Sequence, residues 1–474
     1  MEITTIFIII AICLTYRFIF RKKYIAWFIF AISVVGLYYY QPVSSIRNYD
    51  FWIPSISIFI CILAWILVAS PEFVQNKNTK ITFITIISLF LGFALVRFLP
   101  QRKILEVISI PTQIEILIFL IIMISGVFAL LKSDPKYYFK LLFVIFLFIF
   151  FIFLKNENLA LILSRFLRTI NDQSLELAHS SEIIWIGYSY FAFRLIHVLL
   201  DAHKRGKINM DLHEFIGYLF FLPALLAGPI MRREDYQKSL YQKSEDSKYA
   251  FMSAFYRIFI GLFQKFILAD SLAVISMNNS LVKKISSPVW MWFVVIMYAF
   301  RIYFDFSGYT HIAIGIAKII GINLPENFKQ PLRSPNITMF WNNWHITLTQ
   351  WFRSYYFNPL TRLLRRNFRD LSPDIILAFM QISTMILIGL WHGISWNFTL
   401  WGVWIGIGLF LQSKVSNWFI KKNANGNAFW QINPITRILS VVTTFIYVSL
   451  GWVWFAMLDI STSTYVFRTL FGLG

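Results

Sequence analysis

Long apolar runs constrain the fold of this chain more than any other feature. Two examples are residues 81–96 (ITFITIISLFLGFALV) and 137–154 (YYFKLLFVIFLFIFFIFL), close to the roughly 18 residues that mark a membrane span. Of 474 residues, 58% are hydrophobic and 14% are charged, whereas soluble proteins carry about 25% charge. Because lipid offers no partner for an open strand edge, spanning segments must be helical. The sequence therefore predicts an all-α, polytopic membrane protein.

Charges, prolines and glycines divide the apolar runs into segments, from which we expect about 11–14 membrane helices. The segments are 3–20, 24–41, 51–69, 81–99, 111–131, 137–154, 183–200, 214–230, 251–275, 287–305, 308–322, 375–391, 395–413 and 435–457. The runs 214–230 and 308–322 are short for a crossing, so broken or re-entrant helices are expected there.

The texture of the sequence changes along the chain. Residues 1–160 have few polar groups within their apolar runs and are expected to form a transmembrane scaffold. From 183 to 413, histidines and other polar residues appear inside apolar segments, so we expect a catalytic core there. A C-terminal transmembrane helix is expected within 435–474. We find no internal repeat, and this weakens the case for a secondary transporter.

The basic residues concentrate in short loops. The formal net charge is +20, and basic clusters occur at 21–23, 204–207 and 362–369. Cytoplasmic loops carry such an excess and contact anionic lipid. We therefore expect membrane lipid as the partner of these residues, and no nucleic acid. Binding of an anionic substrate or carrier is the alternative.

The N-terminus and the cysteines predict an uncleaved first span and no metal centre. The basic cluster 21–23 follows the first apolar run, which favours an extracytoplasmic N-terminus in the cytoplasmic (inner) membrane. Cys13 and Cys61 lie within apolar runs, and neither a CxxC nor an HExxH pattern occurs. We expect no metal ligand and no bound cofactor.

The stretch 387–411 (LIGLWHGISWNFTLWGVWIGIGLFL) is long enough to cross a bilayer, yet it contains one titratable side chain, His392. Ionisable groups at membrane depth are costly and often mark functional sites. A neutral imidazole there can serve as a general base. Trp391 is a candidate wall of the site, Asn397 a polar partner, and Gly393 is expected to leave one side of the imidazole open. The alternative is a histidine hydrogen-bonded between helices.

A second stretch, 334–369, is rich in aromatic residues and too polar for a lipid-exposed span. It contains His345 beside Trp344, together with Asn342 and Arg353. We expect a helix that lies in the membrane interface or dips into the protein from it. The alternative is interfacial packing without catalysis. The arginines expected on its cytoplasmic side are 353, 362, 365, 366 and 369.

Two further stretches carry polar groups on helical spacing. In 301–332, Arg301 and Asp305 are four residues apart and are expected to neutralise each other on one helix face, before Ser307 and Gly308 break the pattern. In 191–207, Arg194, His197 and Asp201 form one polar stripe. A seam that locks the helix bundle is the favoured interpretation of both, and substrate handling is the alternative. In 220–230, Pro223, Gly228 and Pro229 predict a broken helix that lines a cavity.

These stretches together resemble the membrane-bound O-acyltransferase family. The motifs FDFSGYTHIAIG, LPENFKQP, FWNNWHITLTQWFR and GLWHGISWNFTLWG follow one another as that family's signatures do, and GYSYFAFRLIHVLLD and FFLPALLAGPI resemble two further family stretches. The resemblance covers about 183–413. It is strongest to the bacterial branch that contains the alginate O-acetylase membrane subunit and the teichoic-acid D-alanyl transfer protein.

The resemblance implies a helical funnel with histidines near its centre. His392 would be the principal catalytic residue and His345 its partner, with substrate bound by Trp344, Trp391, Asn397, Arg353, Asn342, Asp305 and Tyr309. The chain departs from the family at Ser354, where relatives commonly have Asp, and at His311, where many also have Asp. The sequence PENFKQP favours acetyl over D-alanyl transfer.

The favoured hypothesis is acyl transfer from a thioester, acetyl-CoA, whose phosphates are drawn by loop arginines from the cytoplasmic side. His392 would take the proton from an acceptor hydroxyl, and His345 would position the acceptor or help to stabilise the oxyanion. The resemblance also implies an extracytoplasmic partner acyltransferase and a polysaccharide acceptor. The alternatives are D-alanyl transfer from a carrier-protein thioester, a transporter or export channel with histidine proton relays, and a non-catalytic subunit.

Overall fold

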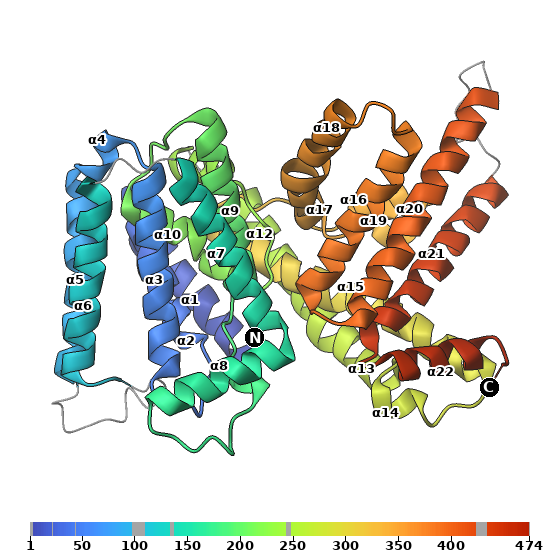
Figure 1. Ribbon diagram of the computed structural model, residues 1–474, viewed down its shortest axis with the longest axis horizontal. Coiled ribbons are helices and arrows are strands. Elements are labelled where there is room, and N and C mark those ends of the chain that lie inside the picture. The colour runs from blue at the N-terminus through green and yellow to red at the C-terminus, as the bar shows by residue number, and fades with distance from the viewer. Residues whose placement is uncertain are drawn as a thin grey trace. The chain divides into compact units, whose positions relative to one another are not determined.

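The computed structural model describes residues 3–20, 22–42, 44–96, 110–132, 137–242, 248–422 and 434–473 (Figure 1). These residues form helices and loops, and strand-like pairing among them is limited to an isolated bridge between Ala69 and Ile208. The chain divides into two compact units. Unit 1 comprises Met1–Phe251 with Ile316–Asn323, and unit 2 comprises Met252–Gly315 with Leu324–Gly474. The expected core 183–413 therefore contributes to both units.

Nine helices among the described residues are long and apolar enough to cross a membrane, which confirms the predicted fold class. They are Tyr49–Val68, Lys77–Leu95, Gln113–Lys132, Tyr138–Lys155, Tyr249–Val282, Pro288–Ile319, Pro373–His392, Trp396–Trp418 and Pro434–Ala456. Two shorter apolar helices, Ile3–Ile19 and Leu212–Ala224, accompany them. The end of the expected segment 81–99, residues 97–99, lies outside the described residues.

Unit 1 consists of helices joined by short loops. Its elements are α1 (Ile3–Ile19), η1 (Lys22–Tyr24), α2 (Ile25–Tyr39), α3 (Tyr49–Val68), α4 (Pro71–Val74), α5 (Lys77–Val96), α6 (Gln113–Lys132), α7 (Tyr137–Lys155), α8 (Glu157–Ile170), η3 (Ser180–Glu182), α9 (Tyr188–Arg205), α10 (Leu212–Leu219), η4 (Leu222–Ala224), α11 (Arg233–Tyr241) and the first turn of α12 (Lys248–Leu262). The expected span 183–200 corresponds to α9, which is not among the nine candidates.

The central helix of unit 1 is α3. In its most apolar window 78% of the residues are buried, whereas the corresponding windows of α6 and α7 are 17% and 11% buried. A helix that exposes apolar side chains over most of its surface needs lipid around it. The role of the N-terminal region as scaffold and lipid-facing wall stays a prediction.

The polar stripe of α9 binds neighbouring segments of unit 1. The buried Arg194 guanidinium donates hydrogen bonds to the carbonyl oxygens of Leu219 and Ala224, at 2.9 and 2.7 Å. The Nε2 atom of His197 is hydrogen-bonded to the Tyr218 hydroxyl at 2.8 Å. These contacts fasten α9 to α10 and η4, as the bundle-locking interpretation predicts for Arg194 and His197.

A buried ion pair closes the loop between α8 and α9. Arg168 Nε donates a hydrogen bond to Glu182 Oε2 at 2.9 Å, and Ser164 Oγ donates to the same oxygen at 2.6 Å. Both charged side chains are less than one tenth exposed. The hydrogen bonds from Arg168, with those from Ser164 and Ser45, lower the pKa of the Glu182 carboxyl from 4.5 to about 2.

We expect a Glu182→Gln variant to have a lower melting temperature than the wild type at pH 7. The folded carboxyl has a lower pKa than the unfolded one, so its contribution to stability is complete above about pH 4.5 and is lost as the pH falls towards 2. The difference in melting temperature should therefore shrink below pH 4.5, and thermal unfolding in detergent measures it. A difference that stays constant from pH 7 to pH 3 would contradict this assignment.

Unit 2 contains the remainder of α12, then η5 (Phe263–Ala269), α13 (Asp270–Ile275), α14 (Asn279–Val282), α15 (Pro288–Ile319) as far as Gly315, η6 (Pro331–Arg333), α16 (Ile337–Asn343), α17 (Ile346–Phe352), η7 (Arg353–Phe357), α18 (Asn358–Asn367), α19 (Pro373–His392), α20 (Trp396–Lys422), α21 (Pro434–Ala456) and α22 (Ile460–Leu470). The C-terminal region thus has two helices where one membrane helix was predicted. The segments η5 and η7 are π-helical, and such segments often occur at functional sites.

Two sequence predictions about α15 are wrong. The segments 287–305 and 308–322 were expected to be separate, but α15 runs through Ser307 and Gly308. Gly308 does not break the helix because it permits close packing: a Cβ there would lie 2.8 Å from the carbonyl oxygen of Gly261. Asp305 pairs with Lys265 of η5 rather than with Arg301, whose guanidinium donates to Ser276 Oγ at 3.2 Å. The ion pair therefore joins two helices, as expected, but with a different cation.

The helices α19 and α20 form a close hairpin (Figure 1), and His392 is the last residue of α19 before the turn. Ser372 caps α19 by accepting a hydrogen bond from the backbone N–H of Ile375. At the other end, a Cβ on Gly389 would lie 2.2 Å from the carbonyl oxygen of Phe398. Small residues let the two backbones approach, and the hairpin in turn places His392 at the end of a braced helix.

Candidate functional site

His345 lies in the connection between α16 and α17, outside the nine candidate spans. Its φ angle of 42° is in the left-handed region, which non-glycine residues enter rarely and at a cost of about 1–3 kcal/mol. Such strain persists only where the surroundings hold the residue in place. The contacts around His345 do so.

Asn327, from the loop LPENFKQP, holds the His345 connection in place. Its backbone oxygen accepts a hydrogen bond from Ile346 N at 3.0 Å. Its side-chain Oδ1 accepts from Thr347 N at 3.2 Å and from Thr347 Oγ1 at 2.9 Å, and lies 3.2 Å from His345 Nδ1. A backbone N–H can only donate, so the shared atom is the amide oxygen, and His345 must donate to it through Nδ1–H.

This hydrogen bond determines which nitrogen of His345 is available for chemistry. With the proton on Nδ1, Nε2 of the neutral ring carries a lone pair. Burial lowers the pKa of His345 to about 3, so the ring is neutral at physiological pH. Among the described residues, Nε2 is buried and has no hydrogen-bond partner. A buried polar atom of this kind requires an explanation, and an acceptor positioned for an incoming hydroxyl is one.

The two predicted catalytic histidines meet at one aromatic residue. The Trp391 ring lies 6.0 Å from the His345 ring and 4.4 Å from the His392 ring, measured between centroids. Phe306 packs edge-on against His345 at 4.7 Å, and Phe455 packs edge-on against His392 at the same distance. The site is therefore a two-histidine centre within an aromatic enclosure.

The space beside His392 differs from the sequence-based expectation. Gly393 was expected to leave one side of the imidazole open, but a Cβ at this position would lie 2.6 Å from the Phe398 ring. Phe398 also stacks on the His392 ring at a centroid distance of 6.0 Å. Glycine is needed here because an aromatic ring occupies the space, and substrate access must come from another direction.

The other predicted substrate-binding residues fall into three groups. Trp344 and Tyr309 are buried, and Trp344 stacks on Phe340. Arg353 donates to Asn342 Oδ1 at 2.9 Å, so these two form one pair at the start of η7.

The remaining two of these residues are engaged in helix packing. Asn397 donates both amide hydrogens within the protein, to the Met457 carbonyl oxygen and to Ser463 Oγ. Asp305 pairs with Lys265. We therefore leave Asn397 and Asp305 out of the proposed substrate contacts.

Sequence reasoning missed three residues of this centre. Asn327 orients His345. In the sequence it appears only as the asparagine of the motif LPENFKQP, which was expected to be a loop. Trp341 and Trp401 place indole N–H groups in the interior that have no hydrogen-bond partner among the described residues. Their rings lie 5.6 Å apart, and Trp401 lies 6.0 Å from His392. A carbonyl oxygen of a substrate could accept hydrogen bonds from these two indole N–H groups.

A basic pocket of about 860 Å³ adjoins the His345 connection. Its wall includes Asn343, the last residue of α16, two positions before His345. Its three cations are Lys329, Arg333 and Arg437. A pocket of this size with three cationic side chains is suited to an anionic ligand.

Comparisons with known proteins identify the family of this chain. The model of the MBOAT, membrane-bound O-acyltransferase family, matches residues 136–450. A probable alginate O-acetylase from Azotobacter vinelandii is 30% identical over 292 residues, which cover 61% of this chain and 54% of that protein. A peptidoglycan O-acetyltransferase from Helicobacter pylori is 28% identical over 318 residues, covering 61% and 57% of the respective lengths.

A teichoic acid D-alanyltransferase from Streptococcus thermophilus is 31% identical over 250 residues, which cover 50% of this chain and 58% of that protein. The chain thus spans a little over half the length of these relatives. The family match extends over more than half of this chain and includes His345, His392 and Asn327. On that basis the chain is a member of the membrane-bound O-acyltransferase family.

Proposed function

We propose that this chain is a membrane O-acyltransferase that moves an acetyl group from acetyl-CoA towards hydroxyls of an extracytoplasmic polysaccharide. The observation that carries the proposal is the two-histidine centre, in which His345 is buried with Nδ1 bonded to Asn327 and Nε2 without a partner. The relatives are named for alginate, peptidoglycan and teichoic acid, and these names support an acceptor in the cell envelope.

The proposed reaction is direct attack of a hydroxyl on a thioester. His392, as general base, removes the hydroxyl proton while the oxygen bonds to the thioester carbonyl carbon. The tetrahedral intermediate then expels the thiolate, which takes the proton back from the His392 imidazolium and leaves as a thiol. An ester and a thiol result, with no net proton released.

His345 positions the acceptor in this reaction. In the neutral form with the proton on Nδ1, Nε2 accepts a hydrogen bond from a neighbouring hydroxyl of the acceptor, not from the one that His392 deprotonates, and it cannot donate one to an oxyanion. Oxyanion stabilisation therefore falls to other donors. The indole N–H groups of Trp341 and Trp401 are the candidates, because both are buried and have no partner among the described residues.

The basic pocket is the proposed site for the donor's phosphates. Lys329, Arg333 and Arg437 line it, and arginine pairs with phosphate in a bidentate geometry. We expect Arg333→Ala and Arg437→Ala to raise KM for acetyl-CoA about tenfold or more with little change in kcat, because they remove binding that is equal in the ground and transition states. Steady-state kinetics measure this. A fall in kcat at unchanged KM in both variants would place the donor elsewhere.

The donor is tested with purified protein. Radiolabelled acetyl-CoA and a D-alanyl carrier-protein thioester are supplied separately with envelope polysaccharide, and ester formation and free thiol are followed. The proposal predicts acetyl ester and CoA from acetyl-CoA, and neither product from the carrier thioester. Product from the D-alanyl donor alone would replace the acetyl assignment. No product from either donor, with membranes that supply the proposed partner also added, would contradict the enzyme hypothesis.

We further place the chain in the cytoplasmic (inner) membrane with its N-terminus outside, and propose that an extracytoplasmic acyltransferase partner completes the transfer. The supporting observation for the orientation is the concentration of basic residues outside the nine candidate spans, among them the arginines of α18 and of the segment that follows it.

A further inference from the structure

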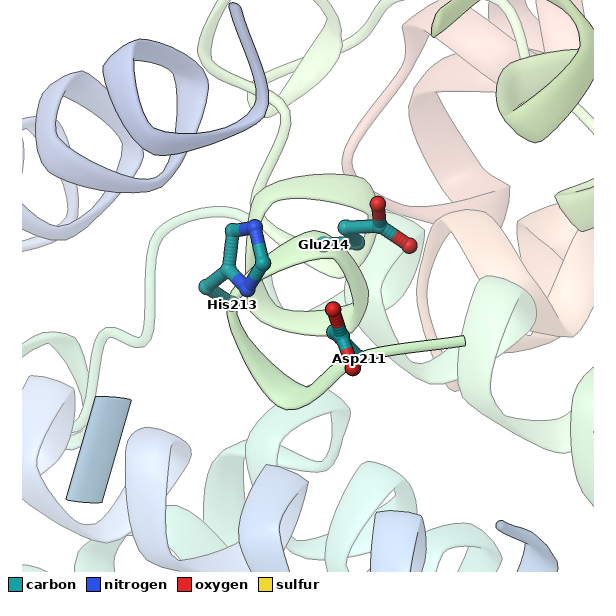
Figure 2. Close-up of side chains that lie close together, drawn as sticks. All are labelled: Asp211, His213 and Glu214. Atoms are coloured by element: carbon teal, nitrogen blue, oxygen red, sulfur yellow. The ribbon is translucent and has the colours of Figure 1, made fainter. Parts of the chain in front are cut away.

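A buried cluster of three potential metal ligands lies in unit 1, at the start of α10. Asp211, His213 and Glu214 each offer a ligand atom, and these atoms lie within 4.8 Å of one another. Figure 2 shows the three side chains around the first turn of the helix. Their exposed fractions are 5%, 3% and 4%, so the cluster belongs to the interior and not to a solvated acidic surface.

Two polar atoms of this cluster have no partner in the protein. His213 Nδ1 and Glu214 Oε2 are buried and make no hydrogen bond among the described residues. Neither Asp211 nor Glu214 takes part in an ion pair in the part of the chain that the structure describes. Buried carboxylates are normally paired with a cation or bound to a metal, because an isolated buried charge is costly.

The surroundings hold each of the three side chains in one orientation. Asn76 and Asn78 donate to the two carboxylate oxygens of Asp211, at 2.7 and 2.9 Å. Each of these oxygens keeps a second lone pair for a ligand bond. Such outer contacts are typical of residues that bind metals.

The other two ligand side chains are held by aromatic residues. The Trp27 ring stacks on the His213 imidazole with centroids 4.1 Å apart and planes inclined by 8°. The Tyr241 hydroxyl donates to Glu214 Oε1, which leaves Oε2 as the oxygen without a partner.

We propose that Asp211, His213 and Glu214 bind a divalent transition-metal cation of the Zn²⁺ class. One imidazole nitrogen and two carboxylate oxygens are a donor set that Zn²⁺ accepts, and two carboxylates balance its charge. Ligands at about 2.0–2.2 Å from Zn²⁺ lie at most about 4.4 Å apart, so the present separations close with small side-chain rotations. The cation braces the start of α10 against Trp27 of α2 and against Asn76 and Asn78 around the start of α5.

No metal site was predicted from the sequence because neither a cysteine pair nor HExxH spacing occurs in it. The Asp-x-His-Glu arrangement matches neither, and its meaning depends on burial and on Asn76, Asn78 and Trp27, which are distant in sequence. The metal cluster lies in unit 1 and the two catalytic histidines in unit 2. The proposal therefore does not rest on the acyltransferase function.

The experiment is a zinc titration of the purified full chain in detergent, after chelator treatment and dialysis. Bound metal is measured by elemental analysis, and Co²⁺ is substituted as an absorption probe of the ligand set. We expect about one Zn²⁺ per chain. We also expect affinity to fall at least tenfold in His213→Ala and Glu214→Gln, and about 10- to 100-fold in Asn78→Ala, which removes an orienting contact.

The matched control is His203→Ala, because His203 is exposed at the end of α9 and should leave zinc binding unchanged. Size-exclusion profiles and melting temperatures show which variants fold. If His213→Ala does not fold, Glu214→Gln and Asn78→Ala carry the test. Glu214→Gln keeps the volume of the side chain, and Asn78→Ala changes only a residue at the edge of the site. Wild-type protein without stoichiometric zinc, or equal zinc affinity in Glu214→Gln and wild type, would overturn the proposal.

Discussion

Replacing His392 with alanine is expected to lower kcat for acyl transfer by about 10²- to 10⁴-fold, with KM for the donor nearly unchanged. The proposed role of His392 is to take a proton during the chemical step, and general-base catalysis contributes a factor of this size. His392 ends a braced hairpin and contacts the rings of Trp391 and Phe455. Thiol release from acetyl-CoA by the purified variant, compared with the wild type, measures the effect.

Two controls separate catalysis from folding in this experiment. His203→Ala removes an exposed histidine of unit 1 and should retain wild-type kcat. His392→Ala should also elute and melt as the wild type does, because the hairpin that carries this residue is held together by the close approach of α19 and α20 at Gly389. A folded His392→Ala protein with more than a tenth of wild-type kcat would remove His392 from the role of base.

Replacing Asn327 with alanine is expected to lower kcat about 10²-fold, although Asn327 is not proposed to touch either substrate. Its Oδ1 accepts hydrogen bonds from His345 Nδ1–H and from the Thr347 backbone N–H. Without it, the proton of His345 is no longer fixed on Nδ1, and the strained backbone at His345 is no longer held in place. Misplacement of a positioning group by about 1 Å costs about this factor. Asn327→Asp keeps an acceptor oxygen and should recover much of the lost rate.

A double-variant comparison tests whether Asn327 acts through His345. If it does, Asn327→Ala combined with His345→Ala should be no slower than His345→Ala alone, because residues that act as a unit are not additive. A merely structural role predicts instead that the two losses multiply, and that Asn327→Asp does not recover the rate. Multiplicative losses would therefore contradict the positioning role.

The fold class could be predicted from the sequence because a membrane helix is recognised by the hydrophobic composition of one continuous segment. Long apolar runs fall on the nine candidate spans. Glycine was the least reliable residue type for predicting where a helix ends. At Gly308 a residue that suggested a break instead allows a close helix contact, and this depends on Gly261, which is far away in the sequence.

The candidate site was predicted less completely because its chemistry depends on contacts between distant segments. His345 and His392 stood out as ionisable groups in apolar surroundings. The tautomer of His345 depends on Asn327, 18 residues away, and the space beside Gly393 depends on Phe398. Asp305 was paired with Arg301 on helical spacing alone, but Lys265 of another helix is its partner. No local pattern contains these pairings.

The most direct test of the central claim is the O-acetyl content of envelope polysaccharide in cells that express the wild type, His392→Ala or His345→Ala at equal membrane levels. O-acetylation is expected with the wild type, and its loss is expected in both variants. Wild-type O-acetyl content in the His392→Ala cells would contradict the claim that the two histidines form the acyl-transfer site.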